Sequence, residues 1–170
     1  SNGAFDRVSK RMETLDNLEA TLKVKGDDVV GRVEQFMKDL KDKQKEIDEL
    51  KEKLQAQASG DLFANPESLK GDMVFKAVNA PDGSDLRKLG DLFIDKNPKG
   101  VVLITSVKGD KASVFLKTFK GNKDINCSNI LKDVLDANGG RGGGKPDMAQ
   151  GSVDPDKISA VETMVRENLQ

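Results

Sequence analysis

The sequence contains no histidine, no tryptophan and no tyrosine, and its only cysteine is Cys127. Histidine is the usual general base at neutral pH and the usual partner of a catalytic serine or cysteine, so its absence excludes most nucleophilic enzymes built from this chain alone. A single thiol without histidine also excludes a Cys/His zinc site or a disulfide within one chain. We interpret Cys127, on the face of a predicted helix, as a small buried apolar residue. The composition therefore favours a binding or assembly module.

Long apolar runs are also absent, whereas charge is abundant. No run approaches the roughly 18 residues that a membrane-spanning helix needs. Charged residues make up 34% of the 170-residue chain, and hydrophobic residues only 36%, whereas about a quarter of the residues are charged in ordinary globular domains. This excess of charge predicts that part of the chain is a long solvated helix beside one small domain.

The N-terminal part has the spacing of two helices. Apolar residues within 5–22 lie three and four positions apart, which is typical of one face of a helix, and Gly26 indicates its end. In the helix that follows, apolar positions recur in heptads interrupted only by Lys43: Val29, Val33, Phe36, Leu40, Ile47, Leu50 and Leu54. Heptads with charged flanks are typical of a coiled coil. We therefore predict an antiparallel coiled-coil helical hairpin over residues 1–58.

After Ala58-Ser59-Gly60, where we expect that helix to end, strands and helices alternate. We expect strands over 73–80, 101–107 and about 112–119, and helices over 85–96, around 128–137, and after Asp154 as N-cap with Pro155 at the first helical position. The fold class is therefore α+β: the long hairpin is followed by a small α/β domain with a mixed sheet over residues 59–170.

Between the last two predicted helices lies the segment GGRGGGKPDMAQG, residues 139–151. Its first seven residues fit the G-x-x-x-x-G-K pattern of a phosphate-binding loop, but Pro146 stands where serine or threonine must hold Mg²⁺, and the segment follows a helix instead of a strand. A flexible glycine linker is an alternative, although the specific string after the glycines opposes it. Consecutive glycines permit close approach to a backbone or a phosphate. With Arg141 and Lys145 beside them, a polyanion is the natural ligand.

This segment resembles the glycine-rich signature of the C-terminal domain of alanyl-tRNA synthetases, in which the pattern is close to GG-x-GGG-[RK]-PDMAQ-x-G. The order of a helical hairpin followed by an α/β domain is also similar to that family. This chain departs from the pattern slightly at Ser152-Val153. The globular part is further similar to the domain that follows the DHH domain in nucleases and phosphodiesterases, where it grips single-stranded nucleic acid.

The resemblance implies a non-catalytic fragment that binds the elbow of tRNA(Ala) and couples aminoacylation to editing. The parent enzyme would attach alanine to tRNA(Ala) with ATP. We expect it in the cytoplasm, with no membrane among its partners. The editing centre of the family uses histidines, so a chain without histidine is expected to follow that centre in the full-length sequence. ATP, Mg and Zn are expected only in the upstream domains, and we expect no cofactor in this fragment. Further expected partners are the upstream editing domain and a second copy of the chain, through the coiled coil or the globular domain. The alternatives are a homodimerisation or assembly module, and the nucleic-acid-gripping domain of a DHH-type phosphodiesterase.

Charge within the globular part points to a nucleic acid partner independently of the resemblance. Residues 96–123 hold seven lysines and one acid, whereas 61–95 and 124–170 each carry a net charge of −3. These lysines either follow phosphates or protect a sheet edge, and we interpret Phe115 and Phe119 among them as core residues. The candidate tRNA-binding residues are Arg141, Gly142, Gly143, Gly144, Lys145 and Gln150, followed by Lys108, Lys117 and Lys120.

Overall fold

The computed structural model describes residues 2–170, which divide into two compact units between Lys53 and Leu54. The N-terminal unit consists of α1 (Asn2–Leu22) and the greater part of α2 (Asp28–Leu62). Within residues 2–53 the only buried side chain is that of Val29. This unit therefore has two helices and almost no core of its own.

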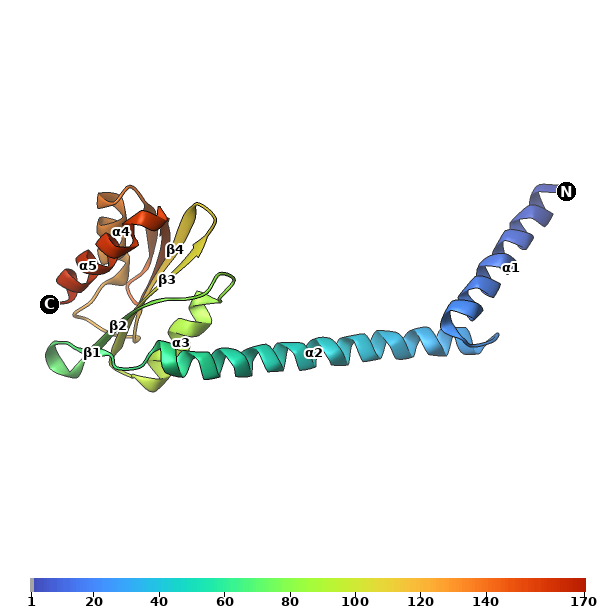
Figure 1. The fold of residues 1–170 in the computed structure, drawn as a ribbon, viewed down its shortest axis with the longest axis horizontal. Coiled ribbons are helices and arrows are strands. Elements are labelled where there is room, and N and C mark those ends of the chain that lie inside the picture. Colours follow the sequence, from blue (N-terminus) through green and yellow to red (C-terminus); the bar gives the residue numbers. More distant parts are fainter. Residues whose placement is uncertain (1) are drawn as a thin grey trace. The chain divides into compact units, whose positions relative to one another are not determined.

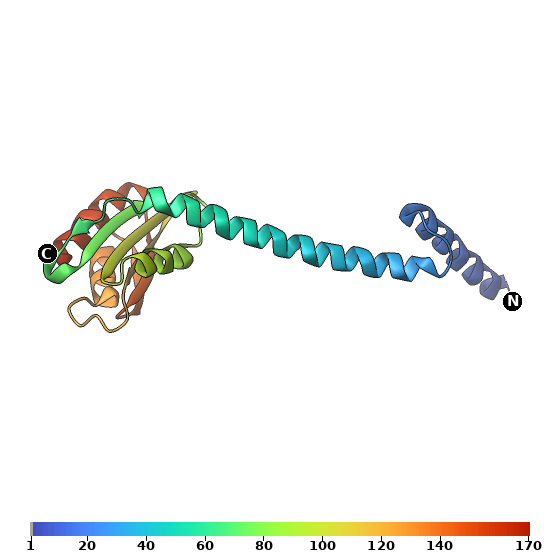
Figure 2. The same cartoon turned by 90° about the horizontal axis from the view of Figure 1, so that it is seen from below.

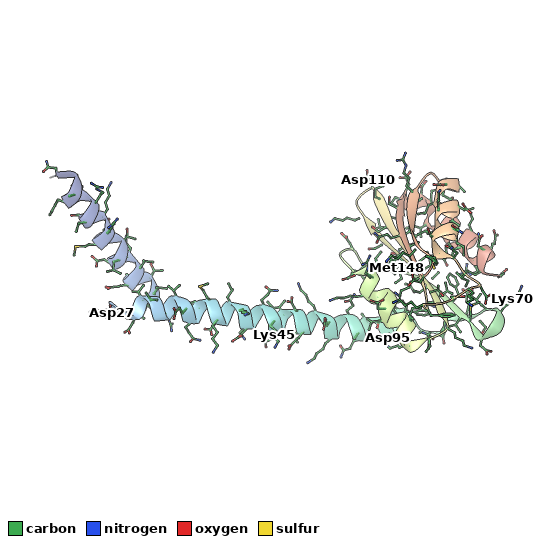
Figure 3. All side chains as sticks on the ribbon, turned by 180° about the vertical axis from the view of Figure 1, so that it is seen from behind. Asp27, Lys45, Lys70, Asp95, Asp110 and Met148 are labelled. Carbon is green, nitrogen blue, oxygen red and sulfur yellow. The ribbon has the colours of Figure 1, made fainter. Side chains whose placement is uncertain are left out.

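The two predicted N-terminal helices are present, but their packing as a coiled coil is not confirmed. Phe5 and Met12 of α1 are 74% and 63% exposed, and Phe36 and Leu40 of α2 are 46% and 74% exposed. The side chains of α2 project outward along its length (Figure 3). The helix also continues past the expected stop at Ser59-Gly60 to Leu62. There the backbone N–H of Phe63 donates to the carbonyl of Ser59 at 3.0 Å, the bond of a regular helical turn.

The second unit is built on the predicted mixed sheet, which has six strands in the order β1-β2-β3-β4-β6-β5. The strands are β1 (Glu67–Ser68), β2 (Val74–Asn79), β3 (Gly100–Lys108), β4 (Lys111–Thr118), β5 (Arg141–Lys145) and β6 (Met148–Val153). Only β2 and β3 pair in parallel, joined by the crossover helix α3 (Leu86–Lys96). Helix α3 covers one face of the sheet, while α4 (Cys127–Ala137) and α5 (Ile158–Leu169) cover the other (Figures 1 and 2).

Each face of the sheet has its own apolar core. Toward α4 and α5 the core includes Leu103, Leu116, Val134 and Val165. Toward α3 it consists of Phe63, Ala80, Leu89, Phe93, Val102, Ile104 and Phe115. Phe115 is 2% exposed, so its interpretation as a core residue is confirmed. Because β-strand side chains alternate between faces, strand β4 contributes to both cores while exposing little of itself.

Local hydrogen bonds and backbone angles define how several elements begin and end. Asp85 caps α3, its carboxylate accepting from the backbone N–H of Lys88 at 3.1 Å. The β3–β4 turn has Gly109 at φ 60°, the left-handed region in which glycine is favoured. Asp154 stands at the N-cap position of a 3₁₀ turn that begins with Pro155, as predicted, but its side chain caps no backbone N–H: the carboxylate accepts from Nζ of Lys111 at 2.8 Å. The chain then makes a short 3₁₀ turn over Pro155–Lys157 before α5 begins.

Candidate nucleic-acid interface

The glycine-rich segment is a β-hairpin, which corrects its interpretation as a loop and excludes a flexible linker. Strand β5 pairs with β6 from Arg141 opposite Ser152 to Lys145 opposite Met148, and β5 forms the edge of the sheet. Gly139, at φ 74°, ends α4, and the N–H of Gly140 donates to the carbonyl of Leu135 at 2.8 Å. This is the glycine-terminated helix end that a Schellman motif requires. The hairpin is therefore fixed to α4 at its base.

The three glycines of β5 have different surroundings. A methyl group at Gly142 would lie 2.6 Å from Cδ1 of Leu135 in α4, and one at Gly144 would lie 2.7 Å from Cα of Ala149 in β6. A methyl group at Gly143 would have no atom within 4 Å. Close packing therefore accounts for the glycines at 142 and 144, and Gly143 is the one with open space above it. A role of any of the three in RNA contact stays a prediction.

Strand pairing aligns side chains in three rows on the face of the sheet that carries α3. The first row is Ser113, Ser152 and Arg141; the second is Phe115, Gln150 and Gly143; the third is Lys117, Met148 and Lys145. Neighbouring strands lie about 4.8 Å apart, and alternate residues along a strand about 7 Å apart. The three rows thus bring five of the predicted residues onto one face: Lys117, Arg141, Gly143, Lys145 and Gln150.

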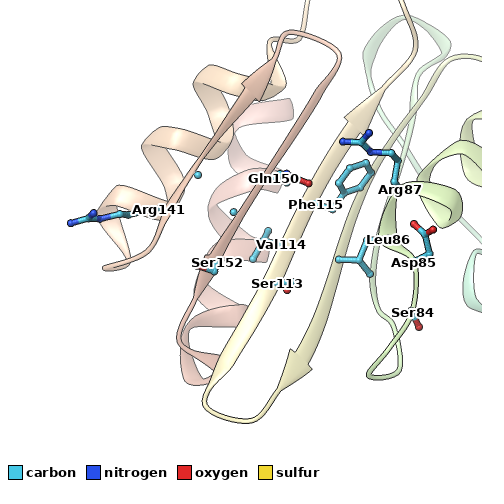
Figure 4. A pocket seen from close by; sticks show the side chains of 12 residues that line it. Ser84, Asp85, Leu86, Arg87, Ser113, Val114, Phe115, Arg141, Gln150 and Ser152 are labelled. Carbon is cyan, nitrogen blue, oxygen red and sulfur yellow. The ribbon is translucent and has the colours of Figure 1, made fainter. Parts of the chain in front are cut away.

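The first row, together with Phe115 and Gln150 of the second, lines an open groove of about 880 Å³ on the same face as α3 (Figure 4). Residues 84–87, at the start of α3, line its other side. Figure 4 shows the side chain of Gln150 directed toward Phe115 and Arg87, and that of Arg141 extending outward from the sheet edge. The only acid in the groove is Asp85, whose carboxylate already accepts the hydrogen bond that caps α3. The groove is hereafter called the α3 groove.

Arg87 is the cation of this groove that the sequence pattern does not reveal. It stands in an acidic region and belongs to no motif, and only the packing of α3 across the sheet brings it opposite Gln150. Within residues 2–170, none of Arg87, Arg141 and Lys145 forms an ion pair. Their charges are therefore available to an anionic ligand.

The predicted basic hairpin does not form one patch. Lys108 lies opposite Lys111 at the β3–β4 turn, whereas Lys120 follows the other end of β4. Because a strand rises about 3.3 Å per residue, the two ends of β4 lie about 23 Å apart. Lys117 lies between them, but its side chain is only 17% exposed and its ammonium group forms an ion pair with Asp91 of α3 at 3.0 Å. The hydrogen bond between Lys111 and Asp154 raises the pKa of Lys111 and lowers that of Asp154.

Cys127 is fully buried, which confirms its interpretation as an apolar residue. Its burial raises the pKa of the thiol to about 12, so the thiol is neutral at physiological pH. Across residues 2–170, no three side chains of the metal-ligating types Cys, Asp and Glu gather closely enough to hold a metal ion. In the same part of the chain, no helix combines the length and apolarity of a membrane span.

The chain is similar to known proteins in sequence and in fold. Residues 70–170 match the family model of the DHHA1 domain. The alanine–tRNA ligase of Alkaliphilus metalliredigens is 32% identical over 167 residues, which cover 96% of this chain and 19% of the relative. The alanine–tRNA ligase of Streptococcus agalactiae serotype V is 34% identical over 169 residues, which cover 98% of this chain and 19% of the relative. The chain thus spans about a fifth of the length of these relatives.

Solved structures give the same result. The C-Ala domain of alanyl-tRNA synthetase from Aquifex aeolicus superimposes with a TM-score of 0.55 at 30% identity, covering 62% of this chain and 97% of that domain. RecJ from Thermus thermophilus, in complex with Mg²⁺, gives a TM-score of 0.54 at 16% identity over 84% of this chain and 21% of RecJ; this likeness shows the fold alone. With a family model matching more than half of its length, the chain belongs to the DHHA1 domain family, and its resemblance to the C-terminal domain of alanyl-tRNA synthetases is confirmed.

Proposed function

We propose that the chain is a non-catalytic module of an alanyl-tRNA synthetase that binds tRNA(Ala) at its elbow. The observation that carries the proposal is the arrangement of β5: Arg141 and Lys145 share one face of an edge strand, separated only by Gly143, which has open space above it. Both cations lack an ion-pair partner within residues 2–170. The relationship to the C-Ala domain supports the choice of tRNA.

The chemistry of these two side chains suits a phosphate backbone. Arginine binds phosphate oxygens through two parallel N–H bonds, whereas lysine contributes a mobile point charge. Four residues along β5 separate their Cα atoms by about 13 Å, so the two side chains contact different phosphates. Base sequence contributes little to such binding, because phosphate contacts fix position without reading bases.

Fluorescence anisotropy with labelled tRNA(Ala) tests the proposal. The double variant Arg141→Ala/Lys145→Ala should bind at least about tenfold more weakly than the wild type, since two charge-assisted contacts are removed. The matched control is Lys132→Ala/Lys157→Ala, which removes two exposed charges outside the α3 groove, from α4 and the turn before α5. If the double variant and the control bind tRNA(Ala) equally well, the hairpin is not the contact.

In the full-length enzyme we propose that the module holds one tRNA for both aminoacylation and editing. The same double substitution placed in the full-length synthetase should then lower aminoacylation and the deacylation of mischarged tRNA(Ala) together. A loss of aminoacylation with unchanged editing would show that the module does not couple the two centres.

Homodimerisation is a second candidate function, favoured by the exposed heptad positions of α2. Leu40, Ile47 and Leu54 are between 45% and 74% exposed, and a second copy of α2 would bury them as a coiled-coil seam. Sedimentation at micromolar concentration should then give a dimer that Leu40→Glu dissociates, with Lys41→Glu on a neighbouring position as control. A wild-type monomer would contradict this role and leave α1 as the partner of α2, as in the hairpin that the heptads predict.

A further inference from the structure

We infer that the α3 groove binds the ribose–phosphate backbone of double-helical RNA, with Ser113, Ser152 and Gln150 contacting ribose 2′-hydroxyl groups. The inference rests on the proposed function and extends it to residues outside the basic pair of β5. The recognised feature of the tRNA would be a base-paired A-form segment. The groove would bind such a segment in preference to a single strand or a DNA duplex.

The first observation is a set of free polar side chains on the floor of the groove. Ser113 and Ser152 face each other across β4 and β6, and Gln150 is next along β6 on the same face. All three are exposed, and within residues 2–170 none of their side chains has a hydrogen-bond partner. Hydroxyl and amide groups both donate and accept, as a 2′-hydroxyl does. The floor thus complements ribose better than it complements phosphate alone.

The second observation is where the two arginines stand. Arg87 lies on the α3 side of the floor and Arg141 on the β5 side, with the two serines between them (Figure 4). From β4 to β5 the floor spans two strand spacings, about 10 Å. The minor groove of A-form RNA is wide and shallow, and it displays 2′-hydroxyls between two phosphate strands. The arginines at the two sides of the floor would face the two phosphate strands, and the serine hydroxyls between them would face the 2′-hydroxyls.

The third observation is that the groove lacks an aromatic platform. Proteins that hold single strands stack bases on exposed aromatic rings. The chain has no tyrosine, tryptophan or histidine, and Phe115, the aromatic residue of the groove, is 2% exposed. Unstacked bases would therefore find no ring surface here, which favours a duplex over a single strand.

Three labelled probes test the inference by anisotropy: an RNA duplex of about 16 base pairs, the span that shape-specific RNA readers cover, a DNA duplex of the same sequence, and one RNA strand. The wild type should bind the RNA duplex about tenfold more tightly than either other probe. Ser113→Ala/Gln150→Ala/Ser152→Ala should lose this preference for RNA while its weaker binding to DNA stays unchanged. Ser159→Ala, which removes an exposed hydroxyl from α5, should behave as the wild type.

Arg87→Ala provides a second variant whose effect is electrostatic. It should weaken binding to both duplexes and reduce the salt slope by about one phosphate, a change of about 0.9 in the log–log plot for DNA. Equal wild-type affinity for RNA and DNA duplexes, or tighter binding of the single strand, would overturn the inference. So would an RNA preference unchanged in the triple variant. If tRNA(Ala) still binds and still depends on Arg141 and Lys145, the proposed function survives this failure; if the wild type binds no tRNA(Ala), the proposed function itself fails.

Discussion

At the scale of single residues, neighbouring glycines of β5 differ in what they permit. Gly142 faces Leu135 of α4, so even one methyl group would force side chain or backbone to move. Gly143, one position along, faces open space. The sequence shows both as glycine in one low-complexity run, and only strand alternation separates their roles.

Gly142→Ala should therefore lower the free energy of unfolding by about 1–3 kcal/mol, the usual cost of overpacking. Gly143→Ala should leave it within about 0.5 kcal/mol, as for ordinary surface changes. Urea unfolding followed by circular dichroism measures both, and equal losses would show that the alternation described here is wrong.

Cys127 provides a prediction about alkaline pH. Because burial raises the pKa of its thiol from 9.0 to about 12, the folded state disfavours the thiolate. This contribution to stability is fully present below pH 9 and is lost as the pH rises through about 12. The free energy of unfolding should fall over that window more steeply in the wild type than in Cys127→Ala, as seen by denaturant titration at each pH. Parallel curves would contradict a buried thiol.

At the scale of elements, the short strand β1 is tied to α5 by one charged contact. Arg166 donates from Nε and Nη2 to the two carboxylate oxygens of Glu67, each at 2.9 Å, and its guanidinium lies 5.7 Å from the ring centre of Phe75. The hydrogen bonds from Arg166 lower the pKa of Glu67. This two-bond geometry is the type of surface ion pair that contributes measurably to stability.

Glu67→Gln should cost about 1 kcal/mol at pH 7, toward the upper end for exposed pairs. Since the pKa of Glu67 is lowered on folding from 4.5, its contribution is present above that pH and is lost as the pH falls through the folded value. The difference between wild type and variant should therefore narrow as the pH falls below 4.5, as measured by thermal unfolding across a pH series. A stability difference between wild type and Glu67→Gln that stays constant with pH would show that the substitution acts through packing and not through the ion pair.

The elements that sequence patterns predicted are those with local signals. The helical spacing of the apolar residues within 85–96 predicted α3, and the apolar run from Val101 to Ile104 predicted the central strand β3. Strands β5 and β6 lacked such a signal, because glycine and alanine have low strand propensity. They are strands because β6 pairs with β4 and β5 pairs with β6. Asp154 had a local signal for capping, but a lysine from another strand competed for its carboxylate.

At the scale of the whole molecule, the sequence identified the hairpin cations but not the surface that they share. Arg141 and Lys145 were found from the glycine-rich motif, whereas Arg87 and the serines required the order of strands and the position of α3. The opposite error occurred for the lysines of residues 96–123, which look clustered in sequence and lie at both ends of the β3–β4 hairpin. Proximity along the chain therefore predicted a lysine patch that the fold does not form, and it gave no signal for the α3 groove.

The salt dependence of tRNA(Ala) binding tests the central claim most directly. Between 50 and 200 mM salt, the wild type should show a steep log–log slope, and Arg141→Ala/Lys145→Ala should lower its magnitude by about 1.4 to 1.8, the contribution of two phosphates. The Lys132→Ala/Lys157→Ala control should keep the wild-type slope. An unchanged slope in the β5 variant, with the same affinity, would contradict the claim that this edge of the sheet binds the tRNA backbone.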